Sequence, residues 1–427
     1  MPEAGTFYVF TLGCKINQYE SQALRESWQS QGLHEVQDPA GAQKILVNSC
    51  AVTDRAVQEL RQAVRRLHRS SPRAEILLTG CAAFDFFPEL QDLPGVSRVV
   101  PPREKHVLDP RSKLEAGETK AFCSLRGIRD FPRSRPVLKV QDGCSSKCTY
   151  CIVPLARGGS RSRPWQEILQ EALALARAGF QELVLSGINL AQFRFPGGGG
   201  FWELVHRLDQ ELVRSLDRPP RLRLSSLDPG LLGDNALQVL DSCRLVCPHL
   251  HLSLQSASPK VLQNMGRWGY QAGQVQDFLS SLRNVWPVYA LGADFLLGFP
   301  GEKEEDFLQT YEFCGTQPLS YAHVFTYSPR PGTQAAQFSD QVAQREKKRR
   351  SQEIRRLMQA KRQDFWQGIS SLSRLEVVLE QNSPALGLCE YYVACLLQEE
   401  PQDLEARDRI LVQPVEVQEQ GLLVSRI

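Results

Sequence analysis

Residues 142–154 read DGCSSKCTYCIVP and come directly after the apolar segment VLKVQ at residues 137–141. Cys144, Cys148 and Cys151 are therefore separated by three and then two residues, on a loop that follows an expected β-strand. Three thiolates at this spacing can hold one [4Fe-4S] cluster and leave its fourth iron without a protein ligand. Such an open position lets a metal centre bind a reactant. The alternative is a zinc knuckle that lacks its fourth ligand.

The chain around this loop repeats a strand–helix unit. In the helix after the first strand, Pro164 suits the first turn, and the apolar face carries Ile168, Ala172 and Leu175. Six such units predict a partial (β/α)6 barrel of the TIM-like type over residues 134–367, with its chemistry at the C-terminal ends of the strands. The five further strands expected are ELVLSG (182–187), RLRLSS (221–226), HLHLSL (249–254), ADFLLG (293–298) and AHVFTY (322–327).

Residues 1–120 show a second α/β pattern, with helices expected near residues 18–31 and 54–69. This alternation predicts a small parallel sheet. Its strands are FYVFTLG (7–13), KILVNS (44–49) and EILLTG (75–80), and they are followed by Cys14, Cys50 and Cys81. Because parallel strands end at one edge of a sheet, these cysteines can converge and hold a second cluster, again with one iron open. Buried structural thiols are the alternative for this triad.

The remaining segments complete an α/β chain of three domains. Residues 101–135 read as a linker that is rich in proline and charge. Residues 341–367 form a basic helix on which Arg345, Lys348, Arg349 and Arg356 share one side, either as a phosphate contact or as a solvated face. Residues 373–427 predict a small antiparallel β-barrel of the size used for RNA contact. Its expected strands are LEVVLEQ, YYVACLL, RILVQPVEV and GLLVSRI.

Composition narrows the classes of function. The chain has 50 Lys and Arg against 48 Asp and Glu, so nucleic-acid binding must come from local patches. We expect a cytoplasmic protein, because the sequence has neither a signal peptide nor an apolar run that could cross a membrane. Such a reducing compartment disfavours disulfides, so we expect the chain's twelve cysteines to be thiols or metal ligands. We interpret six of them as structural thiols: Cys123, Cys243, Cys247, Cys314, Cys389 and Cys395.

The cysteine triplet with Tyr150 before its last member resembles the radical S-adenosylmethionine (SAM) superfamily. Longer strings resemble the methylthiotransferases of that superfamily over nearly the whole chain. These strings are GCSSKCTYCIVPLARGGSRSR (143–163), TLGCKINQYES (11–21), NSCAVT (48–53), TGCAA (79–83), LSSLDP (224–229), HLSLQSAS (251–258), NMGR (264–267) and GFPGE (298–302). The resemblance implies an N-terminal three-cysteine domain, a radical SAM partial barrel and a C-terminal TRAM domain, which is an OB-like β-barrel.

The resemblance also implies two [4Fe-4S] clusters and SAM as cofactors. The catalytic cluster would have Cys144, Cys148 and Cys151 as ligands, would bind SAM at its open iron and would generate a 5′-deoxyadenosyl radical that abstracts hydrogen from C2 of an adenine. The cluster on Cys14, Cys50 and Cys81 would supply the sulfur, methylated by a second SAM. The expected SAM-contacting residues are Tyr150, Asn189, Ser225, Gln255 and Gly298.

The string TLGCKINQYES is most similar to bacterial enzymes that act on N6-threonylcarbamoyladenosine at position 37 of tRNA, beside the anticodon. Enzymes of the isopentenyladenosine type usually have Gln and Met where this chain has Lys15 and Ile16. We therefore expect tRNA as the partner, with an electron donor such as flavodoxin or ferredoxin. The alternatives are methylthiolation of isopentenyladenosine or of a ribosomal-protein aspartate, and a non-catalytic iron–sulfur RNA-binding protein. The sequence leaves the oligomeric state open.

Overall fold

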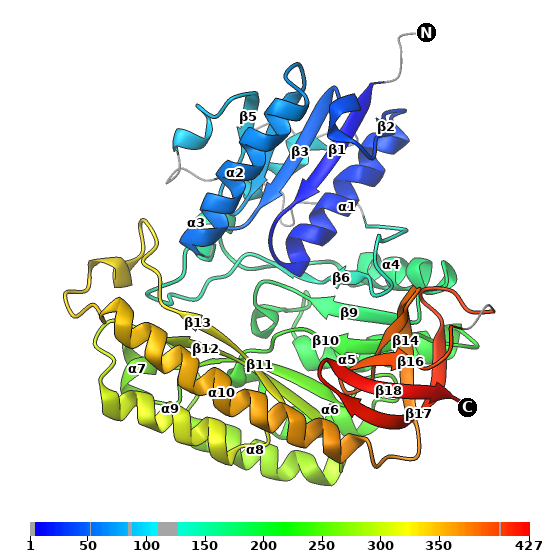
Figure 1. Ribbon diagram of the computed structural model, residues 1–427, viewed down its shortest axis with the longest axis vertical. Helices are drawn as coiled ribbons and strands as arrows, with labels where there is room; N and C mark the ends of the chain where they lie inside the picture. Colours follow the sequence, from blue (N-terminus) through cyan, green and yellow to red (C-terminus); the bar gives the residue numbers. More distant parts are fainter. Residues whose placement is uncertain (1–4, 52, 84–87, 110–126, 401–402) are drawn as a thin grey trace.

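The computed structural model describes residues 5–51, 53–83, 88–109, 127–400 and 403–427. Figure 1 shows an N-terminal sheet above a larger barrel, with a small C-terminal barrel packed against one side of the larger one. The α/β class and the small closed β-barrel that the sequence predicts are confirmed.

The N-terminal sheet has five parallel strands, and its central strand is buried on both faces, as its continuous apolar run requires. The expected strands and the two expected helices are present, and two edge strands join them. In sheet order the strands are β2 (His34–Glu35), β1 (Thr6–Thr11), β3 (Lys44–Ser49), β4 (Glu75–Gly80) and β5 (Val96–Val100). The long helices are α1 (Lys15–Ser30) and α2 (Asp54–Ser70).

The central barrel contains all six expected strands, all parallel and in chain order. They form two three-stranded sheets, β10-β9-β6 and β11-β12-β13, joined by the isolated bridges Leu222↔Val246 and Leu227↔Leu252. The strands are β6 (Val137–Lys139), β9 (Glu182–Ser186), β10 (Arg221–Leu224), β11 (His249–Gln255), β12 (Ala290–Leu297) and β13 (Tyr321–Thr326). The partial barrel is open between β6 and β13, because these two strands are not paired.

Helices flank this barrel (Figure 1). In α4 (Trp165–Arg177) the predicted apolar face, Ile168, Ala172 and Leu175, is fully buried. The other helices are α3 (Val153–Arg157), α5 (Phe201–Ser215), α6 (Asp234–Ser242), α7 (Pro259–Asn264), α8 (Ala272–Val285), α9 (Glu304–Thr316) and α10 (Gln344–Ile369). A short hairpin, β7 (Gln141–Asp142) with β8 (Arg161–Ser162), encloses the cysteine loop.

The basic helix α10 packs along β13 and α9. Its expected phosphate-binding side is only partly free. Arg349 lies within 3.0 Å of carboxylate oxygens of Glu304, Glu346 and Glu353. Arg345, Lys348 and Arg356 are exposed.

The C-terminal barrel is closed, but it is not wholly antiparallel as expected, because β16 and β18 pair in parallel. It also has a strand, β15, that the sequence did not predict. The strands are β14 (Leu375–Asn382), β15 (Ala385–Cys389), β16 (Ala394–Leu397), β17 (Arg409–Gln418) and β18 (Gly421–Arg426). Arg221 and Arg223 of β10 donate hydrogen bonds to backbone carbonyls of this barrel, at Glu376, Leu388, Cys389 and Glu390.

The described parts of the expected linker are packed rather than loose. The 3-10 helix Pro102–Leu108 buries Lys105, and Phe131 lies in the main core. Of the cysteines taken as structural, Cys123 lies outside the described residues and Cys243 is half-buried, while the others are buried. Across the described helices, none is long and apolar enough to span a bilayer.

Candidate functional site

Cys14, Cys50 and Cys81 leave neighbouring strands at one edge of the N-terminal sheet. The register pairs Thr11 with Asn48 and Ser49 with Gly80, so β1, β3 and β4 end side by side. The three cysteines follow these strand ends directly or within three residues. The structure therefore brings the N-terminal triad together, as the repeated strand-end pattern predicts.

Two glycines make this approach possible. Gly13 has φ 125°, and a Cβ built on it would lie 2.9 Å from the Cβ of Cys50. Gly80 has φ 99°, and its Cβ would lie 2.1 Å from the carbonyl oxygen of Ser49. Any larger residue at either position would push the neighbouring strand end away, and glycine alone adopts these φ values without strain. The glycines before Cys14 and Cys81 thus set the spacing of the triad.

The second triad lies on the loop between β7 and α3, at the C-terminal end of the barrel. The amide of Cys144 donates to the carbonyl of Gly158 (3.0 Å), and the amide of Thr149 donates to that of Met265 (3.0 Å). Burial raises the pKa of the Cys151 thiol to about 12, and the nearby Cys148 and Cys144 thiols add to the rise. Burial also raises the pKa of the Cys148 thiol. Bound iron would instead hold its sulfur ligands as thiolates. This donor set fits a [4Fe-4S] cluster.

Arg157 joins the two triads. Its side chain is 1% exposed, and its Nε donates to the Sγ of Cys81 at 3.3 Å. Its Nη1 donates to Glu20 at 2.8 Å and to Asp142 at 2.9 Å, and its Nη2 donates to Asn17 at 3.0 Å. Arg157 lies six residues after Cys151, so one guanidinium links the barrel's cysteine loop to the sulfur of the N-terminal triad.

Buried charges surround this guanidinium. Burial disfavours the Glu20 carboxylate, but Arg157, Lys105 and Lys139 outweigh it and hold the pKa of Glu20 well below its usual range. Burial likewise opposes ionisation of Asp142, but Lys139 and Arg157 lower its pKa to about 2. Three cations therefore face two carboxylates in this cluster, and the positive excess suits the thiolate ligands of an iron–sulfur centre.

A cavity of about 220 Å³ opens beside the cysteine loop. Cys151, Tyr150 and Gln255 lie in its wall, and Thr53 comes from the N-terminal domain. Gln255 ends β11 with φ 68°, a left-handed conformation that is uncommon outside glycine and typical of functional sites. The remaining lining residues are Ile152, Val153, Asp294, Leu296, Phe325, Thr326, Tyr327, Ser328 and Arg330. Arg330 is ion-paired with Asp54 of α2, so both domains close this cavity.

The five residues expected to contact SAM occupy different places. Tyr150 and Gln255 line the cavity, and the Nδ2 of Asn189 lies 3.5 Å from the Sγ of Cys144. Ser225 is buried just past β10, where its amide donates to the carbonyl of Leu185. Gly298 turns the chain after β12 and donates to Glu302, and its α-carbon faces the Lys347 side chain of α10. The structure thus gathers three of the five around the cysteine loop.

A polar cluster inside the barrel was not predicted from the sequence. Tyr321 Oη is hydrogen-bonded to Nε2 of His249 (2.8 Å) and to Nδ1 of His251 (3.0 Å). Asp294 Oδ1 lies 2.9 Å from Nε2 of His251 and 3.1 Å from Nδ1 of His323. The sequence feature that could have revealed this cluster is the presence of His and Asp within strand segments that are otherwise largely apolar. Because Asp294 also lines the 220 Å³ cavity, this cluster adjoins the site.

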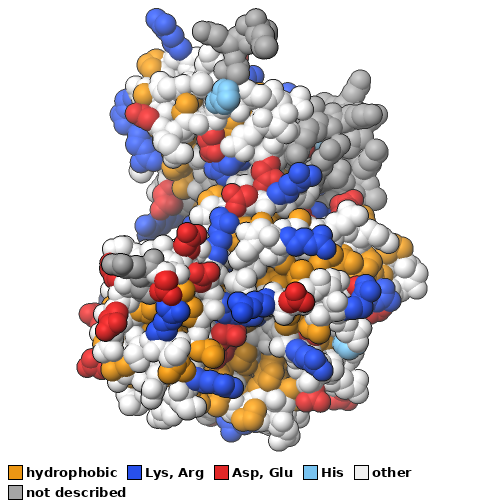
Figure 2. Space-filling view, turned by 90° about the vertical axis from the view of Figure 1, so that its right-hand side faces the viewer, with side chains coloured by type: hydrophobic (Ala, Val, Ile, Leu, Met, Phe, Trp, Pro, Cys, Tyr) orange, Lys and Arg blue, Asp and Glu red, His pale blue; other side chains and the backbone are white. Residues whose placement is uncertain are grey.

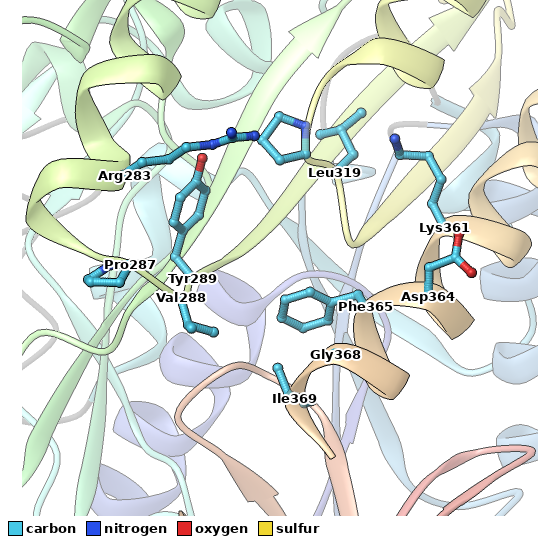
Figure 3. Close-up of a pocket in the computed structure, with 11 residues that line it drawn as sticks. Arg283, Pro287, Val288, Tyr289, Leu319, Lys361, Asp364, Phe365, Gly368 and Ile369 are labelled. Carbon is cyan, nitrogen blue, oxygen red and sulfur yellow. The ribbon is translucent and has the colours of Figure 1, made fainter. Parts of the chain in front are cut away.

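Other parts of the molecule have fewer side chains of the kind that bind a cofactor or a reactant. A cavity of about 530 Å³ lies at the opposite end of the barrel, where Val288, Phe365 and Ile369 point toward one another (Figure 3). It contains none of the cysteines and forms a joint between the barrel, α10 and the C-terminal core. On the face drawn in Figure 2, Lys and Arg side chains are interspersed with Asp and Glu, without a broad patch of one sign.

Comparison with known proteins agrees with this geometry. Residues 6–100 match the model of "Uncharacterized protein family UPF0004", and residues 138–314 match that of the radical SAM superfamily. The chain is 34% identical to a threonylcarbamoyladenosine tRNA methylthiotransferase, MtaB, of Aquifex aeolicus, over 87% of this chain and 92% of that protein. It is 34% identical to the protein of the same name in Bacillus subtilis, over 80% of this chain and 77% of that protein.

Two further similarities are informative. A tRNA-2-methylthio-N6-dimethylallyladenosine synthase of Jannaschia is 32% identical, over 82% of this chain and 78% of that protein. Among solved structures, the radical SAM methyltransferase TsrM of Kitasatospora setae, with cobalamin and a [4Fe-4S] cluster bound, has a TM-score of 0.58 at 13% identity. That match covers 78% of this chain and 77% of TsrM, and it shows a common fold.

Proposed function

The chain belongs to the radical SAM tRNA methylthiotransferases, and from this premise we propose that it methylthiolates C2 of N6-threonylcarbamoyladenosine at position 37 of tRNA. One observation supports the proposal above all others: the Arg157 guanidinium, six residues after Cys151, donates to the sulfur of Cys81 and so links the two cysteine triads. A one-cluster radical enzyme has no need of the first triad, and a purely RNA-binding protein has no need of the second. The 34% identical relatives named for this substrate support the choice of nucleoside.

We divide the work among three domains, residues 1–120, 134–367 and 373–427. We assign one [4Fe-4S] cluster to Cys14, Cys50 and Cys81, and the other to Cys144, Cys148 and Cys151. When bound, the second cluster supplies the electron that cleaves SAM, and the first supplies the sulfur that is transferred. We assign SAM contact to Tyr150, Asn189, Ser225, Gln255 and Gly298.

The chain's own residues position and shield the reactants. The ion pair between Arg330 and Asp54 holds the N-terminal domain over the cavity beside Cys151. Arg157 fixes Cys81 relative to the barrel loop, since its donors are shared between both domains. A fixed separation matters because reactants held in line react far faster than reactants that meet by diffusion. The enclosed wall keeps water and other hydrogen donors from a reactive radical.

We propose tRNA as the partner, with the target adenosine splayed out of the anticodon loop, as single-stranded RNA is usually read. A low-potential electron donor such as flavodoxin or ferredoxin would serve the reductive step. With these partners we propose the cytoplasm as the protein's location.

The test is nucleoside analysis of tRNA from a strain that lacks this gene, with and without the gene restored. We expect 2-methylthio-N6-threonylcarbamoyladenosine to disappear in the deletion strain and its unmethylthiolated precursor to accumulate. The restored gene should reverse both changes, and a Cys50→Ala gene should not. Loss of 2-methylthio-isopentenyladenosine instead would establish the alternative substrate, and an unchanged nucleoside profile would refute both.

A further inference from the structure

Lys15 is the first residue of α1 and directly follows Cys14, a residue of the N-terminal triad. Its side chain is exposed, and it forms no hydrogen bond or ion pair with any residue that the structure describes. Other charged side chains of α1 do have partners: Arg25 pairs with Glu35, and Glu20 pairs with Lys139. An ammonium group beside the proposed sulfur-handling triad therefore remains without a counter-ion among the described residues.

The charges that act most strongly on Lys15 lie in the barrel below it, and they include Arg135, Arg223 and Asp294. The two arginines share the buried Glu182, at 3.6 Å from Arg135 and 2.6 Å from Arg223. Asp294 lies between two imidazoles, those of His251 and His323. Of these charged groups, Lys15 is the one without a partner among the described residues, so its ammonium group can meet an incoming anion.

Adenine geometry indicates which anion would reach it. C2 and the exocyclic N6 lie on the same edge of the base, with N1 between them. When C2 faces the sulfur held near Cys14, a substituent on N6 extends along the same wall. The threonylcarbamoyl substituent ends in a carboxylate, whereas an isopentenyl substituent is a neutral hydrocarbon. A carboxylate can form a charge-assisted hydrogen bond with an ammonium group, and a hydrocarbon would only desolvate it.

We propose that Lys15 binds the carboxylate of the N6-threonylcarbamoyl group and thereby selects this nucleoside over neutral N6-substituted adenosines. This inference rests on the proposed function, because it assigns a substrate group to the same site. A tRNA phosphate offers the same anionic chemistry, but a phosphate contact would strengthen binding of every anticodon loop equally.

The test measures the dissociation constants of two anticodon stem-loops, one with N6-threonylcarbamoyladenosine at position 37 (the modified loop) and one with isopentenyladenosine, whose N6 substituent is neutral. The full-length, anaerobically reconstituted protein is used at one fixed salt concentration. The wild type should bind the modified loop more tightly, and Lys15→Gln should remove roughly tenfold or more of that preference, the usual worth of a hydrogen bond to a charged group. Lys15→Arg should retain part of it.

Lys44→Gln is the matched control. Lys44 begins the central strand β3, at the end of the strand opposite to the cysteines, and pairs with Glu75. This variant should keep the wild-type preference. Iron content of each variant shows whether the clusters have assembled.

An undiminished preference in iron-replete Lys15→Gln would overturn the inference, as would an equal loss of affinity for both loops. Failure of the proposed function gives a different result, because the wild type would then form no methylthio product on the modified loop, whatever the behaviour of Lys15.

Discussion

Cys50 and Cys81 follow their strands directly, and Cys14 follows Gly13, whose positive φ and close approach to Cys50 exclude a larger residue. These cysteines could be found from the sequence because strand ends in a parallel sheet share an edge. Arg157 could not be assigned a role in that way. Its partner Glu20 is 137 residues away in the chain, and the sequence around either residue does not predict that they pair.

Replacing a single cysteine should change the reaction products in a different way for each of the two triads. Cys144→Ala removes a ligand of the SAM-binding cluster, so the variant should produce neither 5′-deoxyadenosine nor methylthiolated tRNA. Cys50→Ala leaves that cluster intact, so it should still cleave SAM but form no methylthio product. Chromatography of both products after reconstitution with a low-potential reductant measures this. A folded Cys50→Ala variant that methylthiolates tRNA at the normal rate would show that the N-terminal assignment is wrong.

Arg157→Gln should destabilise the protein by about 3 to 5 kcal/mol, because it leaves Glu20 and Asp142 with fewer partners in a buried setting. Denaturant unfolding of the reconstituted protein measures the change. The control is Arg55→Gln on α2, whose exposed ion pair with Glu59 should contribute less than about 1 kcal/mol. Equal stabilities of the two variants would contradict the role given to Arg157.

Among the elements, the strands that the sequence missed are short or atypical. β2 has two residues, and β5 is mostly exposed or half-buried, so neither has a clear apolar pattern. β15 reads ALGLC, and its glycine weakens a strand signal, although Gly387 is required where its α-carbon meets Val377 and Val378 of β14. Several barrel strands were predictable from buried leucines at every second position, as in RLRL of β10 and HLHLSL of β11.

The barrel interior should make stability depend on pH. Burial and then Arg223 hold the pKa of His249 well below its usual value, so the folded state keeps this imidazole neutral. Below about pH 6.5 the unfolded chain takes up a proton that the folded chain does not. The free energy of unfolding should therefore fall with decreasing pH, by up to about 1.4 kcal/mol per pH unit from this group.

His249→Gln should remove that part of the slope between pH 6.5 and 5.5 in denaturant unfolding. The same replacement at His34, on the exposed edge strand β2, should leave the slope unchanged. A wild-type slope in His249→Gln would mean that this residue is not held neutral by the fold.

For the whole molecule, the C-terminal barrel is part of the structural core as well as an expected RNA contact. Arg221 and Arg223 lie 4% and 2% exposed at their side chains and donate to its backbone carbonyls. Removing residues 373–427 leaves these donors without their carbonyl partners. The truncated chain should therefore unfold several degrees lower in thermal denaturation, in addition to binding tRNA more weakly. An unchanged melting temperature would show that the two barrels are independent.

The most direct test of the central claim uses the purified, reconstituted wild-type protein with SAM, a low-potential reductant and tRNA that carries N6-threonylcarbamoyladenosine. Nucleosides from the reaction are separated and identified by mass spectrometry, and iron is measured in the same sample. We predict about eight irons per chain, as two cubane clusters require, together with a nucleoside in which a methylthio group replaces hydrogen at C2. About four irons in the fully reconstituted protein, or 5′-deoxyadenosine without any methylthiolated nucleoside, would contradict the account.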